Sequence, residues 1–174
     1  GMNACDASGN EVDGLRDIGK VSSRFRNLYL SGGVYLGGTG SANYLDDYEE
    51  GNYTITTNVG SITANGGYYV KIGNMVYVTG VVGIFSDITS TSEILLSLPF
   101  TSEAGSGRNN HGSIMSRFVN VSGYSLTGYI RDNYNYMNIY INGNNSNNWS
   151  NLKYSDLSSV NAYIRFSISY TTTA

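Results

Sequence analysis

Residues 67–85, GYYVKIGNMVYVTGVVGIF, decide the fold. Apolar, aromatic and β-branched residues lie on both sides of Gly73-Asn74, a pair that favours a two-residue turn. The stretch therefore predicts a β-hairpin with strands over residues 67–72 and 75–85.

The second strand of this hairpin is apolar on both of its faces. A strand of this kind is covered on both sides, either inside one domain or between copies in a trimer, and the pattern leaves both options open. The two predicted faces are Val76, Val78, Val82 and Ile84, and Met75, Tyr77, Val81 and Phe85.

Further alternating segments follow on both sides of the hairpin, separated by turn-forming residues. About eight short strands in one domain are typical of a jelly-roll-like β-sandwich. The other predicted strands cover residues 53–57, 94–98, 112–119, 125–131, 136–141 and 162–171.

The composition agrees with an ordered all-β protein. The 174 residues include 22 Gly and 16 Tyr but a single Pro, and only 13% are charged, compared with roughly 25% in typical domains. Ser and Asn compete with helical hydrogen bonds, whereas aromatic and β-branched side chains fit a pleated sheet. The mixture therefore favours strands and turns.

Charge and cysteine content exclude several function classes. The net charge is −3, and the basic residues are scattered, so we expect no nucleic-acid partner. Cys5 is the only cysteine, which rules out an internal disulfide and a cysteine metal cluster. No apolar run reaches about 18 residues and no signal peptide is present, so we expect no membrane insertion. We also expect no cofactor and no metal.

The glycine-rich segment before the strands, residues 1–51, predicts an extended stem. Residues 28–30 and 34–36 alternate about Ser31-Gly32-Gly33 and predict a short hairpin. One hairpin is marginal in water, so other copies of the chain would complete it in an intertwined oligomer. The alternative is an arm that packs on its own head domain, residues 52–174.

The stem also carries a resemblance to a known family. Asp17-Ile18-Gly19, the run SRFRNLYLSGG at residues 23–33 and VYLGGTGSAN at residues 34–43 resemble the D-L-G…R-F-K-D-L-Y-L-S-G repeat of bacteriophage tail-fibre proteins, common among phages of marine bacteria. LDDYEEG at residues 45–51 is similar to the L-D-D-Y-E-E-G-T-W junction before their C-terminal domains.

The resemblance continues into the head and departs from the family in two places. YVKIGNMVYVTG at residues 69–80 resembles the opening of head domains that follow the same junction. Asn27 stands where an aspartate is usual, and Asn52-Tyr53 replaces Thr-Trp. Both changes leave the family assignment intact, and they would matter only if that aspartate made a contact between chains.

The resemblance implies a virion structural protein in the extracellular phage tail. It implies a homotrimer, joined on its N-terminal side to other tail proteins. Its head would adhere, without catalysis, to a glycan or an outer-membrane component of the host cell surface. Two alternatives remain: a purely structural fibre module and a glycan-cleaving fibre enzyme.

The residues that could carry enzyme chemistry give weak signals. His111 is the only histidine and no G-x-S-x-G motif accompanies it, so we expect a polar loop histidine. Asp46, Asp47, Glu49 and Glu50 could act as paired carboxylates or hold Ca²⁺, but they lie in the junction and read as a solvated linker. The glycine tract at residues 32–40 lacks the Gly-Lys-Ser/Thr ending of a phosphate loop. We expect no enzyme.

Aromatic and amide side chains near residue 140 form the predicted ligand-binding set. Flat rings lose little entropy on binding, and amides pair with sugar hydroxyls. The alternative for the tryptophan is a place in the core. The set comprises Tyr134, Tyr136, Tyr140, Asn144, Asn145, Asn147 and Trp149.

Overall fold

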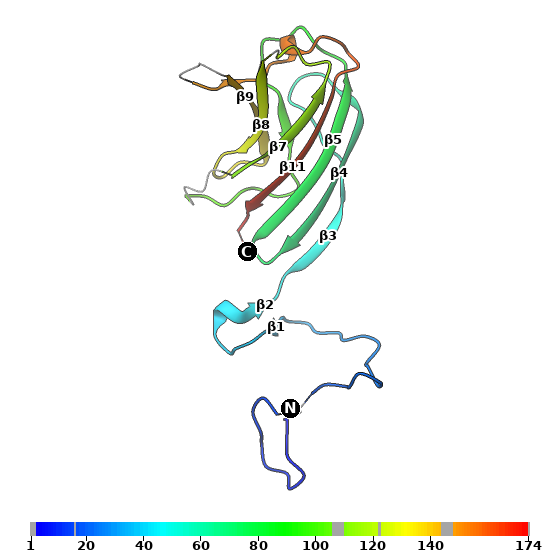
Figure 1. The fold of residues 1–174 in the computed structure, drawn as a ribbon, viewed down its shortest axis with the longest axis vertical. Coiled ribbons are helices and arrows are strands. Elements are labelled where there is room, and N and C mark those ends of the chain that lie inside the picture. The colour runs from blue at the N-terminus through cyan, green and yellow to red at the C-terminus, as the bar shows by residue number, and fades with distance from the viewer. Residues whose placement is uncertain (1–2, 16, 106–109, 122, 144–147, 174) are drawn as a thin grey trace. The chain divides into compact units, whose positions relative to one another are not determined.

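The computed structural model describes residues 3–15, 17–105, 110–121, 123–143 and 148–173. In these residues the fold is all-β, with one antiparallel sheet of nine strands, a small sheet of two strands and no α-helix (Figure 1). The predicted all-β class is therefore confirmed. No helix in the described residues has the length and apolar character needed to cross a membrane. The chain divides into two compact units, Gly1–Gly33 and Val34–Ala174.

The large sheet has the order β10-β9-β8-β7-β11-β5-β4-β3, and β6, which is off this path, pairs with residues 136–138 of β9. Two 3₁₀ turns, η1 (Ser41–Asn43) and η2 (Tyr154–Asp156), accompany the strands. The strands of the large sheet are β3 (Tyr48–Tyr53), β4 (Ile62–Ile72), β5 (Met75–Phe85), β6 (Leu95–Ser97), β7 (Asn110–Arg117), β8 (Tyr124–Ile130), β9 (Tyr136–Gly143), β10 (Ser150–Asn151) and β11 (Tyr163–Thr171).

The hairpin predicted around residues 73 and 74 is confirmed. β4 and β5 pair from Ile72 opposite Met75, and Gly73 takes a φ of 57°, which a glycine adopts without steric cost. The Gly73 N–H donates to the carbonyl of Asp47, 2.7 Å away, and so ties the turn to the segment that leads into β3.

The strand predicted over residues 53–57 is wrong. β3 lies earlier, at Tyr48–Tyr53, where side chains alternate between half-buried and exposed and pair with β4. Ile55 then leaves the sheet and is fully buried in the core. Residues 48–51, expected from the sequence to lie in a solvated linker, belong to this strand because β4 extends far enough to pair with them.

The hairpin predicted between residues 28–30 and 34–36 is also wrong. β1 (Val34–Tyr35) pairs instead with β2 (Tyr44–Leu45). Asn43 stabilises this pairing with two hydrogen bonds to Leu36. The Asn43 carbonyl accepts from the Leu36 N–H at 2.8 Å, and the Asn43 side-chain amide donates to the Leu36 carbonyl at 3.0 Å. The rings of Tyr35 and Tyr44 pack with their centroids 4.7 Å apart. The closure at Asn43 therefore satisfies both backbone polar groups of Leu36.

The face assignment of β5 holds except at its end. Val76, Val78 and Val82 share the core side, as the alternation predicts, but Ile84, assigned to their face, is exposed, and Phe85, assigned to the other face, is buried. Ile84 has a φ of 56°, and the successive N–H groups of Ile84 and Phe85 donate to the carbonyls of Ala162 and Val160. This bulge-like step shifts the alternation by one residue.

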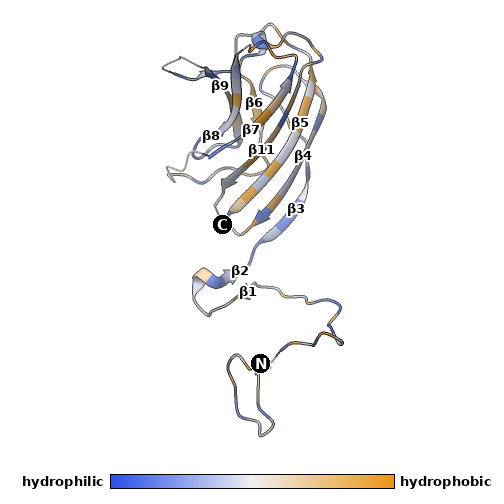
Figure 2. Ribbon diagram, viewed as in Figure 1, coloured by the Kyte–Doolittle hydropathy of each residue, from blue (hydrophilic) through white to orange (hydrophobic). Residues whose placement is uncertain are grey.

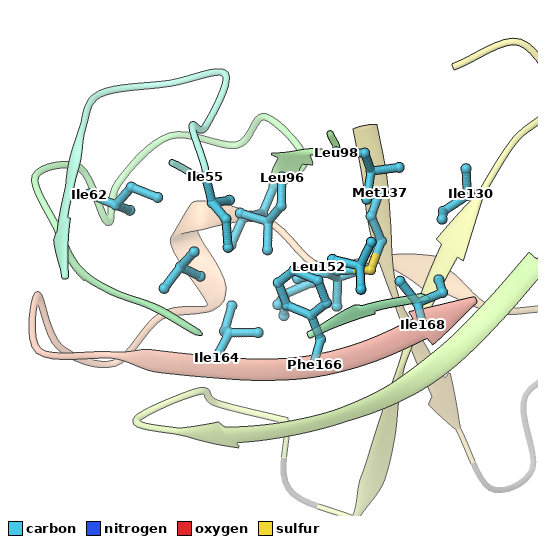
Figure 3. Close-up of a cluster of buried hydrophobic side chains, with 14 of the residues drawn as sticks. Ile55, Ile62, Leu96, Leu98, Ile130, Met137, Leu152, Ile164, Phe166 and Ile168 are labelled. Carbon is cyan, nitrogen blue, oxygen red and sulfur yellow. The ribbon is translucent and has the colours of Figure 1, made fainter. Parts of the chain in front are cut away.

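The core lies inside the curve of the large sheet. Figure 3 shows side chains of β11, such as Phe166, pointing toward Ile55, Leu96 and Met137, which come from the opposite side. β11 is the C-terminal strand, yet it lies between β5 and β7, so residues distant in sequence close the core. Packing of β11 therefore fixes where β8 and β9 lie.

Candidate functional site

β9 presents a different chemistry on each face. Met137 and Ile139 point into the core and are at most 1% exposed. Tyr136, Asn138 and Tyr140 alternate with them and so lie on the outer face, as the sequence predicts. The core side holds this strand in place, whereas on the outer side Tyr136 and Tyr140 are half-buried and Asn138 is covered.

The neighbouring strands extend this outer face. Tyr129 of β8 lies opposite Asn138, and Leu95 of β6 lies opposite the same residue on the other side. Residues directly opposite in an antiparallel pair point to the same side of the sheet. We call this surface the aromatic face, and it comprises Glu93, Tyr129, Arg131, Tyr134, Tyr136, Asn138, Tyr140 and Trp149.

Two groups of edge-to-face rings make up the aromatic part. Tyr140 packs against Tyr129, with centroids 5.4 Å apart, and against Trp149 at 6.1 Å. Tyr134 and Tyr136 form the other pair at 4.9 Å. Trp149 is 69% exposed, so the alternative that placed it in the core is wrong. Rings held by one another offer rigid apolar surfaces to a ligand.

Arg131 connects the two groups of rings. Its guanidinium Nη2 donates to the hydroxyl of Tyr140, 3.1 Å away. This hydrogen bond is the main cause that raises the pKa of Arg131. The charge of Glu93 and a hydrogen bond with Tyr134 raise it further by smaller amounts, whereas burial lowers it. Burial is the largest cause that raises the pKa of Tyr136, so its hydroxyl stays neutral at physiological pH. The face therefore combines the neutral phenol of Tyr136 with the guanidinium cation of Arg131.

Asn138 positions the carboxylate of Glu93. Its Nδ2 donates to Glu93 Oε2 at 2.9 Å, and Asn138 itself is 1% exposed. In the described residues no partner reaches Asn138 Oδ1, which is buried. A buried unpaired acceptor costs about 1–3 kcal/mol.

The structure shows where part of the predicted ligand-binding set lies and leaves its role in binding a prediction. It brings Tyr134, Tyr136, Tyr140 and Trp149 around Arg131, whereas Asn144, Asn145 and Asn147 lie outside the described residues. Sequence reasoning missed four members of the face. The alternation of residues 125–131 could have placed two of them on one side, but the strand pairing was needed to bring them to β9. The missed residues are Glu93, Tyr129, Arg131 and Asn138.

The residues considered for enzyme chemistry do not form a catalytic group. His111, expected in a loop, is instead on β7; it is exposed and lies opposite Tyr129, so it is on the same side of the sheet as the aromatic face. Glu49 and Glu50 are neighbours on β3, so the alternation of that strand points them to opposite faces. Asp47 pairs with the buried amine of Lys71. No group of three or more metal-binding side chains occurs in the described residues.

Comparisons with known proteins give no relative. No family model, no curated protein and no solved structure matches this chain.

Proposed function

We propose that the chain is part of a bacteriophage tail fibre whose head adheres to the host cell surface. The ligand is a glycan or an outer-membrane component, bound without covalent chemistry. The stem resemblance supports the family, and the aromatic face supports the mode of recognition.

The aromatic face is the observation that carries the adhesive role. Sugar rings have apolar C–H faces that pack on aromatic rings, and hydroxyl groups that pair with charged and amide groups. Tyr140 and Trp149 offer the first kind of contact, next to the guanidinium of Arg131 and the carboxylate of Glu93. Hydrogen bonds to charged groups are about twice as strong as neutral ones. These side chains together fit a polar, sugar-like surface.

The proposal also covers the architecture of the head and the assembly of several chains into one fibre. The head is a jelly-roll-like β-sandwich, and the N-terminal segment is an extended stem that intertwines with its copies in a homotrimer. Apolar side chains of the segment are open in the single chain: Ile18 is 80% exposed, Val21 98% and Phe25 71%. Exposed apolar side chains in such numbers are typical of an interface. Three heads on one stem would add avidity to weak single sites.

The same proposal places the protein outside the cell, in the virion, with other tail proteins on its N-terminal side. The role is non-catalytic, and the divergent orientation of Glu49 and Glu50 supports this. A purely structural module would have no use for a conformationally fixed cluster of rings around an arginine.

The experiment measures binding of labelled protein to a panel of bacterial cells and purified surface polysaccharides. Replacement of Tyr140 and Trp149 together by Ala removes the exposed rings. We expect at least about a tenfold loss of affinity for the bound host, as for hot-spot aromatic residues. Tyr124→Ala is the matched control, since Tyr124 is 51% exposed on β8 but lies outside the aromatic face.

Three outcomes would contradict the proposal. Unchanged binding by the folded double variant would show that the aromatic face is not used. If the protein bound none of the cell types, the purely structural fibre module would be the remaining function. Release of reducing sugar from a polysaccharide would show an enzyme.

A further inference from the structure

The other half of the large sheet has an outer face that is apolar at one end. The pairing places Tyr48, Ile72 and Met75 in one row across β3, β4 and β5, and Val70 and Tyr77 in the next. Tyr48 is 60% exposed, Ile72 53%, Met75 56% and Tyr77 45%. Apolar colouring along β4 and β5 is visible in Figure 2. Met75 and Tyr77 are outward side chains of β5, the strand that the sequence shows to be apolar on both faces.

The acidic corner of this face belongs to β3. Glu50 lies opposite Val70, and its Oε2 accepts hydrogen bonds from the hydroxyls of Tyr48 at 2.8 Å and Tyr68 at 3.0 Å. These bonds lower the pKa of Glu50, so the carboxylate is ionised at neutral pH. The result is a fixed anion among exposed aromatic side chains.

The basic corner lies diagonally across the sheet. Arg165 of β11 lies opposite Val81 and Met115, and Arg117 lies opposite Tyr163. The two arginines, with Met115, Ser116 and Tyr163, line a hollow of about 490 Å³. Arg117 stacks on the ring of Phe118, 4.4 Å from its centroid, and in the described residues neither arginine pairs with a carboxylate.

We infer that a second copy of this chain covers this face, with the Glu50 corner of one copy seated against the hollow between Arg117 and Arg165 of the next. One face carries both complementary charges together with apolar side chains, so it can bind itself. A guanidinium fork and a carboxylate form strong paired hydrogen bonds where water is excluded. The number of copies, three, rests on the proposed fibre function, whereas the contact itself does not.

The contact explains two features of the fold. The exposed apolar residues of β4 and β5 become buried, which removes an apolar patch from water. β3, a sheet edge, is brought against another chain and is no longer an open edge. The aromatic face is on other strands of the sheet and stays available for the host surface.

Oxidative footprinting of the full chain tests the inference. Hydroxyl radicals oxidise methionine according to its exposure, and Met75 and Met115 report on the two ends of the face. In concentrated protein we expect both to be oxidised several-fold more slowly than after dilution. Trp149, 69% exposed and on the aromatic face, is the internal reference and should keep its rate.

Substitutions on this face test whether the slower oxidation of Met75 and Met115 comes from the proposed contact between copies. Tyr77→Glu should expose both methionines at every concentration, and so should Glu50→Arg or Arg165→Glu alone. The combination of Glu50→Arg with Arg165→Glu restores opposite charges, so it should restore protection. Circular dichroism checks that each variant is folded, and Tyr77 and Arg165 are exposed positions that tolerate a charge.

Two results would overturn the inference. Equal oxidation of Met75 and Met115 at all concentrations and in all variants would mean that the face is open. Protection that is insensitive both to dilution and to the charge reversals at Glu50 and Arg165 would mean that another segment of the same chain covers it. Failure of cell binding, with protection intact, would count against the proposed function and leave this contact standing.

Discussion

Tyr154 shows how a single hydroxyl organises the loop before β4. The side chain is fully buried and its ring packs edge-on against Phe85, with the centroids 6.3 Å apart. Its hydroxyl donates to Asn58 Oδ1 at 2.9 Å, accepts from the Val59 N–H at 3.2 Å and contacts the hydroxyl of Thr57. One phenol therefore connects Tyr154 with residues 57–59, which are far from it in sequence. Burial raises the pKa of this hydroxyl.

Tyr154→Phe keeps the ring and removes this hydroxyl. The Val59 N–H loses its partner, and an unsatisfied buried donor costs about 1–3 kcal/mol. We expect the free energy of unfolding to fall by that amount in urea denaturation. Tyr124→Phe, at an exposed tyrosine, should change it by less than about 0.5 kcal/mol. Equal effects of the two substitutions would contradict the role of the hydroxyl.

At the scale of the element, β4 depends on an adjacent pair of glycines with opposite surroundings. A Cβ on Gly67 would lie 2.1 Å from the ring of Tyr53, which packs over it from β3. A Cβ on Gly66 would meet nothing within 4 Å. The close approach of β3 to β4 therefore requires glycine at one position and not at its neighbour.

Gly67→Ala should displace Tyr53 from its place. Forcing a methyl group into a filled site costs about 1–3 kcal/mol. Gly66→Ala, the matched control, should be neutral or stabilise by about 0.5 kcal/mol because it restricts the unfolded chain. Thermal unfolding of both variants measures the difference, and a Gly66 variant as unstable as the Gly67 variant would refute the packing argument.

At the scale of the whole molecule, assembly and stability are linked. If the native form is a homotrimer, dilution shifts the equilibrium toward dissociated chains, and the melting temperature falls. We expect light scattering to give three times the 18.8 kDa of one chain, and calorimetry to show a melting temperature that rises with concentration. The mass of one chain, with a melting temperature independent of concentration, would contradict the trimer.

Local sequence determined the strands because the side-chain period of two is a property of neighbours in the chain. Alternation identified β5, β9 and β11, the turn at Gly73-Asn74, and the core positions Val76 and Val78. It failed at Ile84, where a positive φ shifted the phase, and at residues 28–36, where Asn43 closed a different pair of strands. Both failures come from backbone geometry that alternation does not encode.

Strand order was decided only by the tertiary structure. The period of two tells which face a residue takes but not which strand lies beside it, since pairing depends on closing loops and filling the core. Insertion of β11 between β5 and β7 brought Glu50 and Arg165 onto one face, and β8 beside β9 brought Arg131 to Tyr140. The sequence determined that Tyr140 points outward. Only packing of distant strands determined that it meets an arginine there.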